Sequence, residues 1–481
     1  MKNRAARRVA ARYNWDRLKV SFWFTPAVMA LVAILLAWAM YWVDSLIPNE
    51  MLASSRLILS GTPSEMRTSL ISMAGTILAT AGVVFTLLTL PLSTVAAQYG
   101  SRLLRVFLGD RTTQFVLGMF VATFVYCIVA ALSIPPVTVE PEGPQVTTTV
   151  GLFLMMATFA TLILLVQHIS TMLQAPNIAA AAGAKLVEVV GAEIPDEVTI
   201  GDIGQGEFET RPDLQEAPGT PTVKAGGDRP STVMVKAGGD KERRSDRLNT
   251  VMETDGYAVR VRRTGYIQYF DPETILTLAQ EKDLVIHLQR KPGNFVWPGV
   301  VVALVWPVDH VDEQLEEQIR MAFRLGNTRT PTQDIEYALN QLVEMAVRAM
   351  SPAINDPFTA MTCLDYIAEG LTLFIRQGEK DSEYYDLEGR VRLVFEPVTF
   401  EELLGAAFDM LRHASCDNAR VLLHMLGAID VIGQETKSPE ARQMLARHAR
   451  LILAESQVSR LIEDDKQLIQ RSSEALVLKL S

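Results

Sequence analysis

Cysteine is scarce in this chain, with 3 in 481 residues. Cys127 lies in an apolar run, and Cys363 and Cys416 lie far apart in the more charged second half. This usage excludes a disulfide framework and a cysteine-based zinc motif. The sequence also lacks a Gly-Lys-Ser/Thr phosphate loop, a dinucleotide glycine pattern, a paired-histidine zinc helix and a Gly-x-Ser-x-Gly elbow. We therefore expect no enzyme activity, no cofactor and no bound metal.

Basic residues are not in excess, since 45 Lys and Arg face 55 Asp and Glu, for a net charge of −10. An acidic balance argues against nucleic acid as a partner. The mean hydropathy of +0.16 fits neither a pure membrane bundle nor an ordinary soluble enzyme. Because the apolar residues are concentrated before position 173, we expect a membrane domain followed by a water-soluble domain.

Charged side chains are absent from residues 68–98, which are rich in Ser, Thr, Gly and Ala. This stretch predicts a membrane helix with two different faces. One arc carries small and hydroxylated residues, namely Ser69, Ser72, Gly75, Thr76, Ala79, Thr80, Gly82, Thr86 and Ser93. The opposite arc suits acyl chains and holds Ile71, Ile77, Leu78, Val84, Phe85 and Leu88. The small arc either packs closely on another helix or lines a water-filled path.

The same stretch is too long for a simple crossing. At 1.5 Å per residue it covers roughly 46 Å, whereas the hydrocarbon core is about 30 Å thick. Pro91 is the expected hinge, because it removes a backbone donor and its ring clashes with the preceding turn.

Four transmembrane helices are predicted in the membrane domain, near residues 22–43, 69–93, 113–134 and 148–173. The basic arm at 1–21 and the loop that carries Arg102 and Arg105 lie at one end of these spans, and the loop with Glu140 and Glu142 lies at the other. The positive-inside rule then predicts a multi-pass protein of the bacterial inner membrane with both termini in the cytoplasm.

The second half reads as a cytoplasmic α+β region, with a small β-module followed by a helical bundle. Strands are expected at 257–262, 265–270, 284–288, 300–306 and 390–395, and a short helix at 272–281. The predicted parts are a basic arm (1–21), a four-helix transmembrane domain (22–173), a connecting helix (174–198), a flexible insert (199–250), the β-module (251–309) and a mostly helical domain (310–481).

A dense polar cluster is predicted within residues 327–365. Its members are Arg329, Asp334, Arg348, Ser351, Asn355, Asp356 and Thr359. Helix capping by Thr330 and Asp356 explains part of this composition. The remainder is either an internal polar network, with Asn355 and Asp356 meeting Arg329 or Arg348, or a site for a ligand, an ion or a neighbouring subunit.

Two long segments carry a family resemblance. They read "FTLLTLPLSTVAAQYGSRLLRVFLGDRTTQFVLGMFVATFVY" and "RTPTQDIEYALNQLVEMAVRAMSPAINDPFTAMTCLD". Together with four spans, they resemble a bacterial family of predicted inner-membrane proteins, domain of unknown function 2254, with "SPAINDP" as the most specific part. The insert at 199–250 departs from the compact family pattern. The resemblance implies the architecture and the membrane location, but no reaction.

The leading hypothesis is an oligomeric inner-membrane channel or channel-like transporter for small ions, gated by the cytoplasmic domain. Its path would follow the small arc, and Arg102 and Arg105 at the inner mouth would slightly favour anions. Membrane lipid and further copies of the chain are the expected partners. The alternative is a non-conducting scaffold or sensor that oligomerises and binds a ligand or protein through its cytoplasmic domain. A membrane enzyme acting on a lipid-linked substrate ranks third, because no catalytic signature is present.

Overall fold

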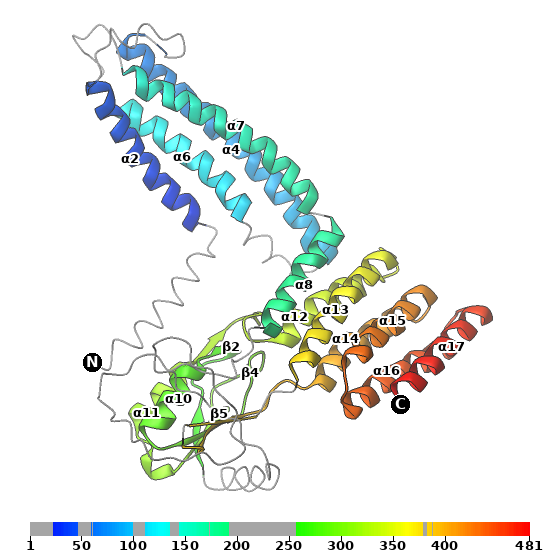
Figure 1. Cartoon of the computed structure of the whole chain (residues 1–481). Helices are drawn as coiled ribbons and strands as arrows, with labels where there is room; N and C mark the ends of the chain where they lie inside the picture. The colour runs from blue at the N-terminus through cyan, green and yellow to red at the C-terminus, as the bar shows by residue number, and fades with distance from the viewer. Residues whose placement is uncertain are drawn as a thin grey trace, which may run out of the picture. The chain divides into compact units, whose positions relative to one another are not determined.

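The computed structural model describes residues 23–46, 59, 61–99, 111–134, 144–172, 174–191, 256–378, 382–386 and 388–481, without the side chains of 87–99 and 172. The predicted basic arm, the inner-mouth residues Arg102 and Arg105, the insert at 199–250 and the side chains of Pro91 and Ser93 lie outside the described residues. The chain divides into two compact units, Met1–Ala182 and Gly183–Ser481 (Figure 1).

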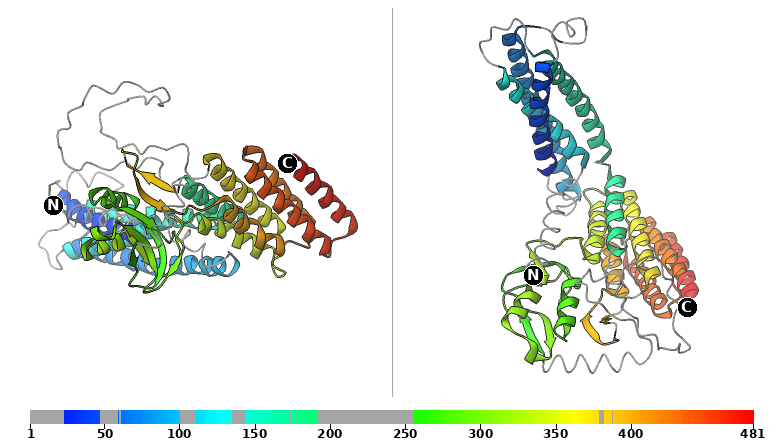
Figure 2. Two further views of the ribbon diagram at one scale, coloured as in Figure 1. Left: turned by 90° about the horizontal axis from the view of Figure 1, so that it is seen from below. Right: turned by 60° about the vertical axis from the view of Figure 1, so that its left-hand side comes forward.

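Four long helices lie side by side in the first unit (Figures 1 and 2). They are α2 (Phe24–Leu46), α4 (Pro63–Tyr99), α6 (Arg111–Ser133) and α7 (Gln145–Met172), and α8 (Ala175–Gly191) follows them. Helix α6 runs parallel to α2, because Thr25 meets Gln114 at the start of both helices. Helix α7 runs the other way, since its first turn meets Asp44 near the end of α2.

Close packing inside this unit depends on small residues. A Cβ atom on Gly118 of α6 would lie 2.4 Å from the sulfur of Met29 in α2, and one on Gly151 of α7 would lie 3.0 Å from Leu70 in α4. Glycine at these two positions lets the helix backbones approach. Large apolar side chains cover the outside, such as Leu31 and Leu35 on α2, which are 60% and 61% exposed. An apolar exterior of this kind suits lipid.

Helix α4 is much longer than the membrane core. Its 37 residues continue as a helix through Pro91 to Tyr99, which corresponds to about 55 Å at 1.5 Å per residue. One end of α4 therefore extends beyond a hydrocarbon core of about 30 Å.

Five of the described helices are long and apolar enough to cross a membrane: α2, α4 up to Thr86, α6, α7 and α13 (Pro357–Gln377). The first four correspond to the predicted spans. The fifth lies in the second unit, so the predicted count of four is not confirmed.

The β-module of the second unit contains two sheets, and helices α10 (Pro272–Glu281) and α11 (Glu313–Ala322) share their core. The five-stranded sheet has the order β1-β5-β3-β8-β7 and consists of β1 (Tyr257–Arg260), β5 (Val301–Trp306), β3 (Val285–Leu288), β8 (Val391–Phe395) and β7 (Glu383–Tyr385). The three-stranded antiparallel sheet has the order β4-β2-β6 and consists of β4 (Phe295–Val296), β2 (Gly265–Phe270) and β6 (Phe323–Gly326). Most neighbouring strands are antiparallel, but β3 and β8 are parallel.

The helical domain begins after the β-module strand β6, and strands β7 and β8 lie between its second and third helices in the sequence. Its helices are α12 (Ile335–Ala349), α13, α14 (Phe400–Ala414), α15 (Ala419–Glu435), α16 (Pro439–Val458) and α17 (Glu463–Leu480). They form two rows, α12-α14-α16 and α13-α15-α17, which lie side by side in Figures 1 and 2. Polar side chains define their starts, including Asp334, Asp356, Asn418 and Ser438.

Three details of this unit differ from the sequence prediction or were absent from it. The predicted cap at Thr330 is wrong, because α12 begins after Asp334, whose carboxylate accepts a hydrogen bond from the amide of Tyr337. Strands β4, β6 and β7 had no predicted counterpart. The strand expected at 390–395 is present as β8, but it pairs with β3 and thus completes the sheet of the β-module.

Candidate functional sites

The small arc of α4 faces away from the bundle. Ser72, Gly75, Thr76, Ala79, Gly82 and Thr86 are exposed, while Ser69 and Thr80 are half-buried. The residues of α4 that pack into the bundle are Met66, Leu70, Ala74, Ile77 and Val84. At 100° per residue the centre of this buried seam lies opposite the small arc. The expectation that Ile77 and Val84 face acyl chains is therefore wrong, since both belong to the seam.

The threonine hydroxyls of the small arc bond to their own helix. Thr76 donates to the carbonyl of Ser72 at 3.0 Å, Thr80 to that of Thr76 at 2.8 Å and Thr86 to that of Gly82 at 3.1 Å. Each hydroxyl proton is thus occupied, and the oxygen retains lone pairs that can accept. The oxygens of these three threonines can coordinate a cation or accept a hydrogen bond from water, but in this rotamer the three hydroxyls offer no donor to an anion.

Asp44 of α2 accepts three hydrogen bonds from the start of α7. Its carboxylate accepts 2.8 Å hydrogen bonds from the amides of Val146 and Thr147, and a third at 2.5 Å from the Thr147 hydroxyl. The two amides belong to the first turn of α7, where they have no partner within the helix and where a negative charge is also favoured by the helix dipole. The sequence analysis missed this site, because a cap donated from a different helix has no local sequence pattern.

Further polar contacts join α6 to its neighbours. Thr25 of α2 donates to the side chain of Gln114 at 2.9 Å, and the hydroxyls of Thr123 and Thr158 lie 2.7 Å apart with both residues buried. The hydroxyl of Tyr126 donates to the carbonyl of Thr147 at 2.9 Å. Such contacts hold membrane helices together. They fix the bundle and leave the small arc of α4 as its polar outer surface.

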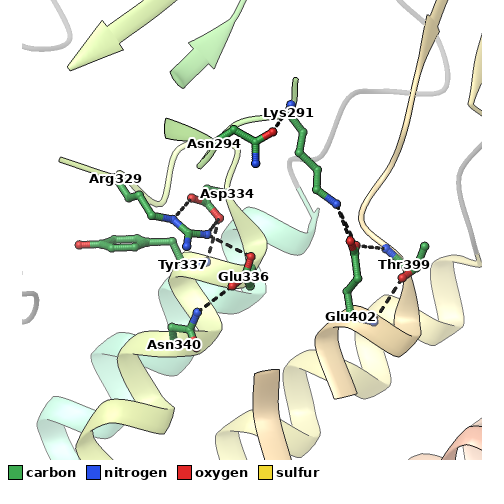
Figure 3. A network of polar contacts seen from close by, with 9 residues as sticks. All are labelled: Lys291, Asn294, Arg329, Asp334, Glu336, Tyr337, Asn340, Thr399 and Glu402. Carbon is green, nitrogen blue, oxygen red and sulfur yellow. Dashed lines mark hydrogen bonds and ion pairs between the residues drawn. The ribbon is translucent and has the colours of Figure 1, made fainter. Parts of the chain in front are cut away.

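The predicted cytoplasmic cluster separates into two groups at opposite ends of α12. At the first end, Arg329 forms two 2.7 Å hydrogen bonds to the carboxylate of Asp334 and a longer one of 3.2 Å to Glu336 (Figure 3). Asp334 is 3% exposed. Burial raises the pKa of Asp334, and the Arg329 guanidinium and the Tyr337 amide act against this rise. The pair is a structural ion pair rather than an open binding site.

The second group lies at the turn between α12 and α13. The Asp356 carboxylate caps α13 through the amide of Thr359 at 3.1 Å and its hydroxyl at 2.5 Å. Asn355 has φ of +47°, and its amide donates to the carbonyl of Ser351. Arg348 pairs with Glu344 one turn earlier in α12. The structure therefore does not show the expected pairing of Asn355 and Asp356 with either arginine.

A second ion pair joins the β-module to the helical domain. The Lys291 ammonium lies 2.8 and 2.9 Å from the two carboxylate oxygens of Glu402, which also forms a capping box with Thr399 at the start of α14 (Figure 3). Burial would raise the pKa of Glu402, but the bonds from Lys291 and the Thr399 amide hold it below its ordinary value. Gly293 follows Lys291 by two residues in the sequence. A Cβ on Gly293 would be 2.3 Å from Asp334 Oδ2, so this loop lies directly against the Arg329–Asp334 ion pair.

The described part of the second unit has several surface hollows, and two of them are grooves large enough for a small molecule. A groove of about 1060 Å³ follows α13 and α15, with the ion pairs Asp365–His424 and Arg376–Glu435 on its lining. A smaller groove of about 620 Å³ lies on the β-module and combines arginine with aromatic side chains. Among the described residues, no group of three or more His, Cys, Asp or Glu side chains is placed to hold a metal ion.

The apolar helices of the first unit and their apolar exterior define a membrane protein with several candidate spans. The chain belongs to the DUF2254 family of predicted membrane proteins, whose family model matches residues 19–430. This confirms the resemblance drawn from the two sequence segments. The chain is similar to uncharacterized protein Mb1321c of Mycobacterium bovis and uncharacterized protein Rv1290c of Mycobacterium tuberculosis. Each is 24% identical over 426 residues, which cover 86% of this chain and 72% of the relative. No solved structure matches the chain.

Proposed function

We propose that the chain assembles into a homo-oligomeric channel or channel-like transporter for small ions, with the small arc of α4 from each copy lining a shared path. The observation that carries this proposal is the position of the arc, which points away from the bundle of its own chain. A hydroxylated surface at membrane depth is better satisfied by water or another copy than by acyl chains. Four spans of one copy are too few to enclose a pore, so the path requires several copies.

The threonines of the arc favour cations over anions. Their hydroxyl protons bond to helix carbonyls, so their oxygens act as acceptors toward the path. The earlier preference for anions depends on Arg102 and Arg105, which lie outside the described residues. The comparison of potassium with chloride flux decides between these two arguments.

The same proposal places the protein in a bacterial inner membrane, in contact with lipid, with four crossings and both termini in the cytoplasm. The basic residues that precede α2 in the sequence, and those between α4 and α6, support this orientation. Neither a reaction nor a nucleic-acid partner is part of the proposal.

The test is flux through liposomes and planar bilayers that contain the purified full-length protein. The variant Thr76→Val keeps the volume of the side chain but removes its oxygen, and Thr76→Leu adds volume. A path lined by the arc predicts that both variants reduce conductance while the oligomer stays intact. The matched control is Leu78→Phe, which adds volume to an exposed apolar position of the same helix and should leave conductance unchanged.

The alternative is a non-conducting scaffold or sensor that oligomerises through this arc and binds a ligand or protein through its second unit. The predominantly apolar groove along α13 and α15 favours it. In that case Thr76→Leu dissociates the oligomer, Thr76→Val has little effect on assembly, and folded wild-type protein passes no ions. This outcome would exclude the channel proposal.

A further inference from the structure

A groove on the β-module has the chemical composition of a ligand site. It lies beside the end of β1 and the loop that leads from β3 into β4, and its volume of about 620 Å³ is in the range of small-molecule sites. Its lining includes Arg260, Arg290, Asn294, Phe295 and Trp297. Two features distinguish this groove from an ordinary polar surface.

The first feature is a pair of arginines without carboxylate partners. Arg260 donates to the carbonyl of Gly299 at 2.7 Å and Arg290 to that of Gln289 at 2.8 Å, and within the described residues neither guanidinium pairs with an acid. By contrast, Arg320 in the same module pairs with Glu316 and Glu317. A guanidinium has five N–H donors, so each of the two groove arginines retains donors for an anion, and their planar geometry suits phosphate.

The second feature is a pair of exposed aromatic rings. Phe295 and Trp297 are 49% and 57% exposed, whereas Phe270 and Phe323 of the same module are almost fully buried. The Phe295 ring is held in place by an edge contact with Tyr266, with centroids 5.0 Å apart, and its centroid is 6.5 Å from that of Trp297. The anchored ring of Phe295 and the exposed ring of Trp297 lie beside the two arginines, and together they form a surface on which a planar ring can stack.

We propose that this groove binds a phosphate-bearing ligand that also contains a planar ring, which is the chemistry of a nucleotide. Arg260 and Arg290 would bind the phosphate groups, and Phe295 and Trp297 would contact the base. Asn294 supports the site indirectly, because its side chain accepts a hydrogen bond from the Lys291 amide and so fixes the loop. This proposal does not depend on ion conduction.

The test is isothermal titration of the full-length protein in detergent with ATP, GTP, CTP and UTP. Pyrophosphate and adenosine serve as half-ligands. We expect saturable binding of at least one nucleotide, tighter than either half-ligand. Because a charged bidentate contact and a stacked base each contribute a factor of about ten or more, Arg290→Gln and Trp297→Leu should each weaken binding at least tenfold.

Matched controls come from the same module. Arg263 is exposed and Trp306 is 43% exposed, and neither lines the groove. Arg263→Gln and Trp306→Leu should leave the affinity unchanged. Arg290→Lys keeps the charge but loses the fork geometry, so it should bind with intermediate affinity and provides a second variant if Arg290→Gln fails to fold.

Three results would overturn the proposal. Pyrophosphate that binds as tightly as the nucleotides, together with an unaffected Trp297→Leu variant, would define a plain anion site. Binding only to phosphatidylglycerol vesicles, lost in Arg290→Gln, would assign the groove to lipid head groups. If the folded protein binds none of these probes, the groove does not have this function.

Discussion

Gly293 combines two constraints at the junction of the β-module and α12. Its φ is +91°, and a Cβ would lie 2.3 Å from Asp334 Oδ2 and 2.9 Å from Arg329 Nη2. We predict that Gly293→Ala destabilises the protein by about 2–3 kcal/mol, since the strained backbone adds to the clash with a buried ion pair. Urea denaturation of the full chain, followed by tryptophan fluorescence, measures this change.

Gly389 separates the two effects, because its φ is +73° and a Cβ there would have open space. Gly389→Ala should cost only about 1 kcal/mol, which is the backbone contribution alone. If Gly293→Ala and Gly389→Ala lose the same free energy of unfolding, the clash with Asp334 does not contribute to the destabilisation of Gly293→Ala.

The two ion pairs near this junction differ in burial and therefore in their effect on stability. Asp334 is 3% exposed, whereas the Lys291 and Glu402 side chains are 27% and 51% exposed. We predict that Arg329→Met lowers the free energy of unfolding by about 3 kcal/mol, because it leaves a buried carboxylate without its countercharge. Lys291→Met should cost less than about 1 kcal/mol, since the solvated Glu402 remains hydrated.

A second variant that removes the Asp334 charge tests whether this unpaired charge is what makes Arg329→Met more destabilising than Lys291→Met. In the double variant Arg329→Met, Asp334→Asn, the amide oxygen can still cap α12, and no buried charge is left unpaired, because Glu336, the other partner of Arg329, is 43% exposed. We expect it to be more stable than Arg329→Met alone in the same denaturation assay. If the double variant is the less stable of the two, an unpaired Asp334 charge is not the cause.

At the scale of whole elements, the start of α7 depends on a residue of α2. Three donors of the first turn of α7 bond to the Asp44 carboxylate. We predict that Asp44→Ala lowers stability by about 2 kcal/mol and Asp44→Asn by about half as much, because the amide keeps an acceptor but loses the charge. Thermal unfolding in detergent, followed by circular dichroism, measures both.

The neighbouring Ser45 provides the control. It is exposed, and its hydroxyl bonds to the carbonyl of Trp42 within α2 itself. Ser45→Ala should therefore unfold at the wild-type temperature. If Asp44→Ala also unfolds at that temperature, the link between α2 and α7 does not stabilise the bundle.

Elements with a strong periodic pattern were predictable from the sequence, and elements specified by distant partners were not. The apolar runs predicted α2, α4, α6 and α7, the alternation in residues 257–262 predicted β1, and a β-like composition in residues 265–270 predicted β2. Strand β6 has four residues directly after α11, and its pairing with β2, more than 50 residues away, determines its conformation. Thr330 has the local features of a cap, but the bonds of Asp334 to Arg329 and to the Tyr337 amide favour a later helix start.

The same reasoning applies to the candidate sites. The small arc of α4 was visible as a pattern, yet its outward direction became clear only from the packing of Leu70 and Ile77. Lys291 and Glu402 are 111 residues apart, and Asp44 and Val146 are 102 residues apart. No local pattern encodes contacts over such separations. The residues of the predicted polar cluster at 327–365 do not form a single group, because α12 lies between its two halves.

At the scale of the whole molecule, α13 determines how often the chain crosses the membrane. By its length and composition α13 could span a membrane. Half of its most apolar stretch, however, is buried against other parts of the protein. It also carries Asp365, Glu369 and Arg376, two of which pair with residues of α15. Charges at a helix centre are costly in lipid, and two of these three charges are used in ion pairs between α13 and α15. We therefore predict four crossings, which place the two termini on the same side of the membrane.

Reporter fusions to the full chain measure this directly. Green fluorescent protein fluoresces inside the cell and alkaline phosphatase is active outside, and each is fused in turn to the N-terminus and to the C-terminus. Four crossings give fluorescence at both ends and phosphatase activity at neither. A fusion within the loop between α6 and α7 is the control and should give the opposite pattern. Termini on opposite sides would mean that α13 crosses the membrane, and the bundle of α12–α17 would then lie partly in lipid rather than in water.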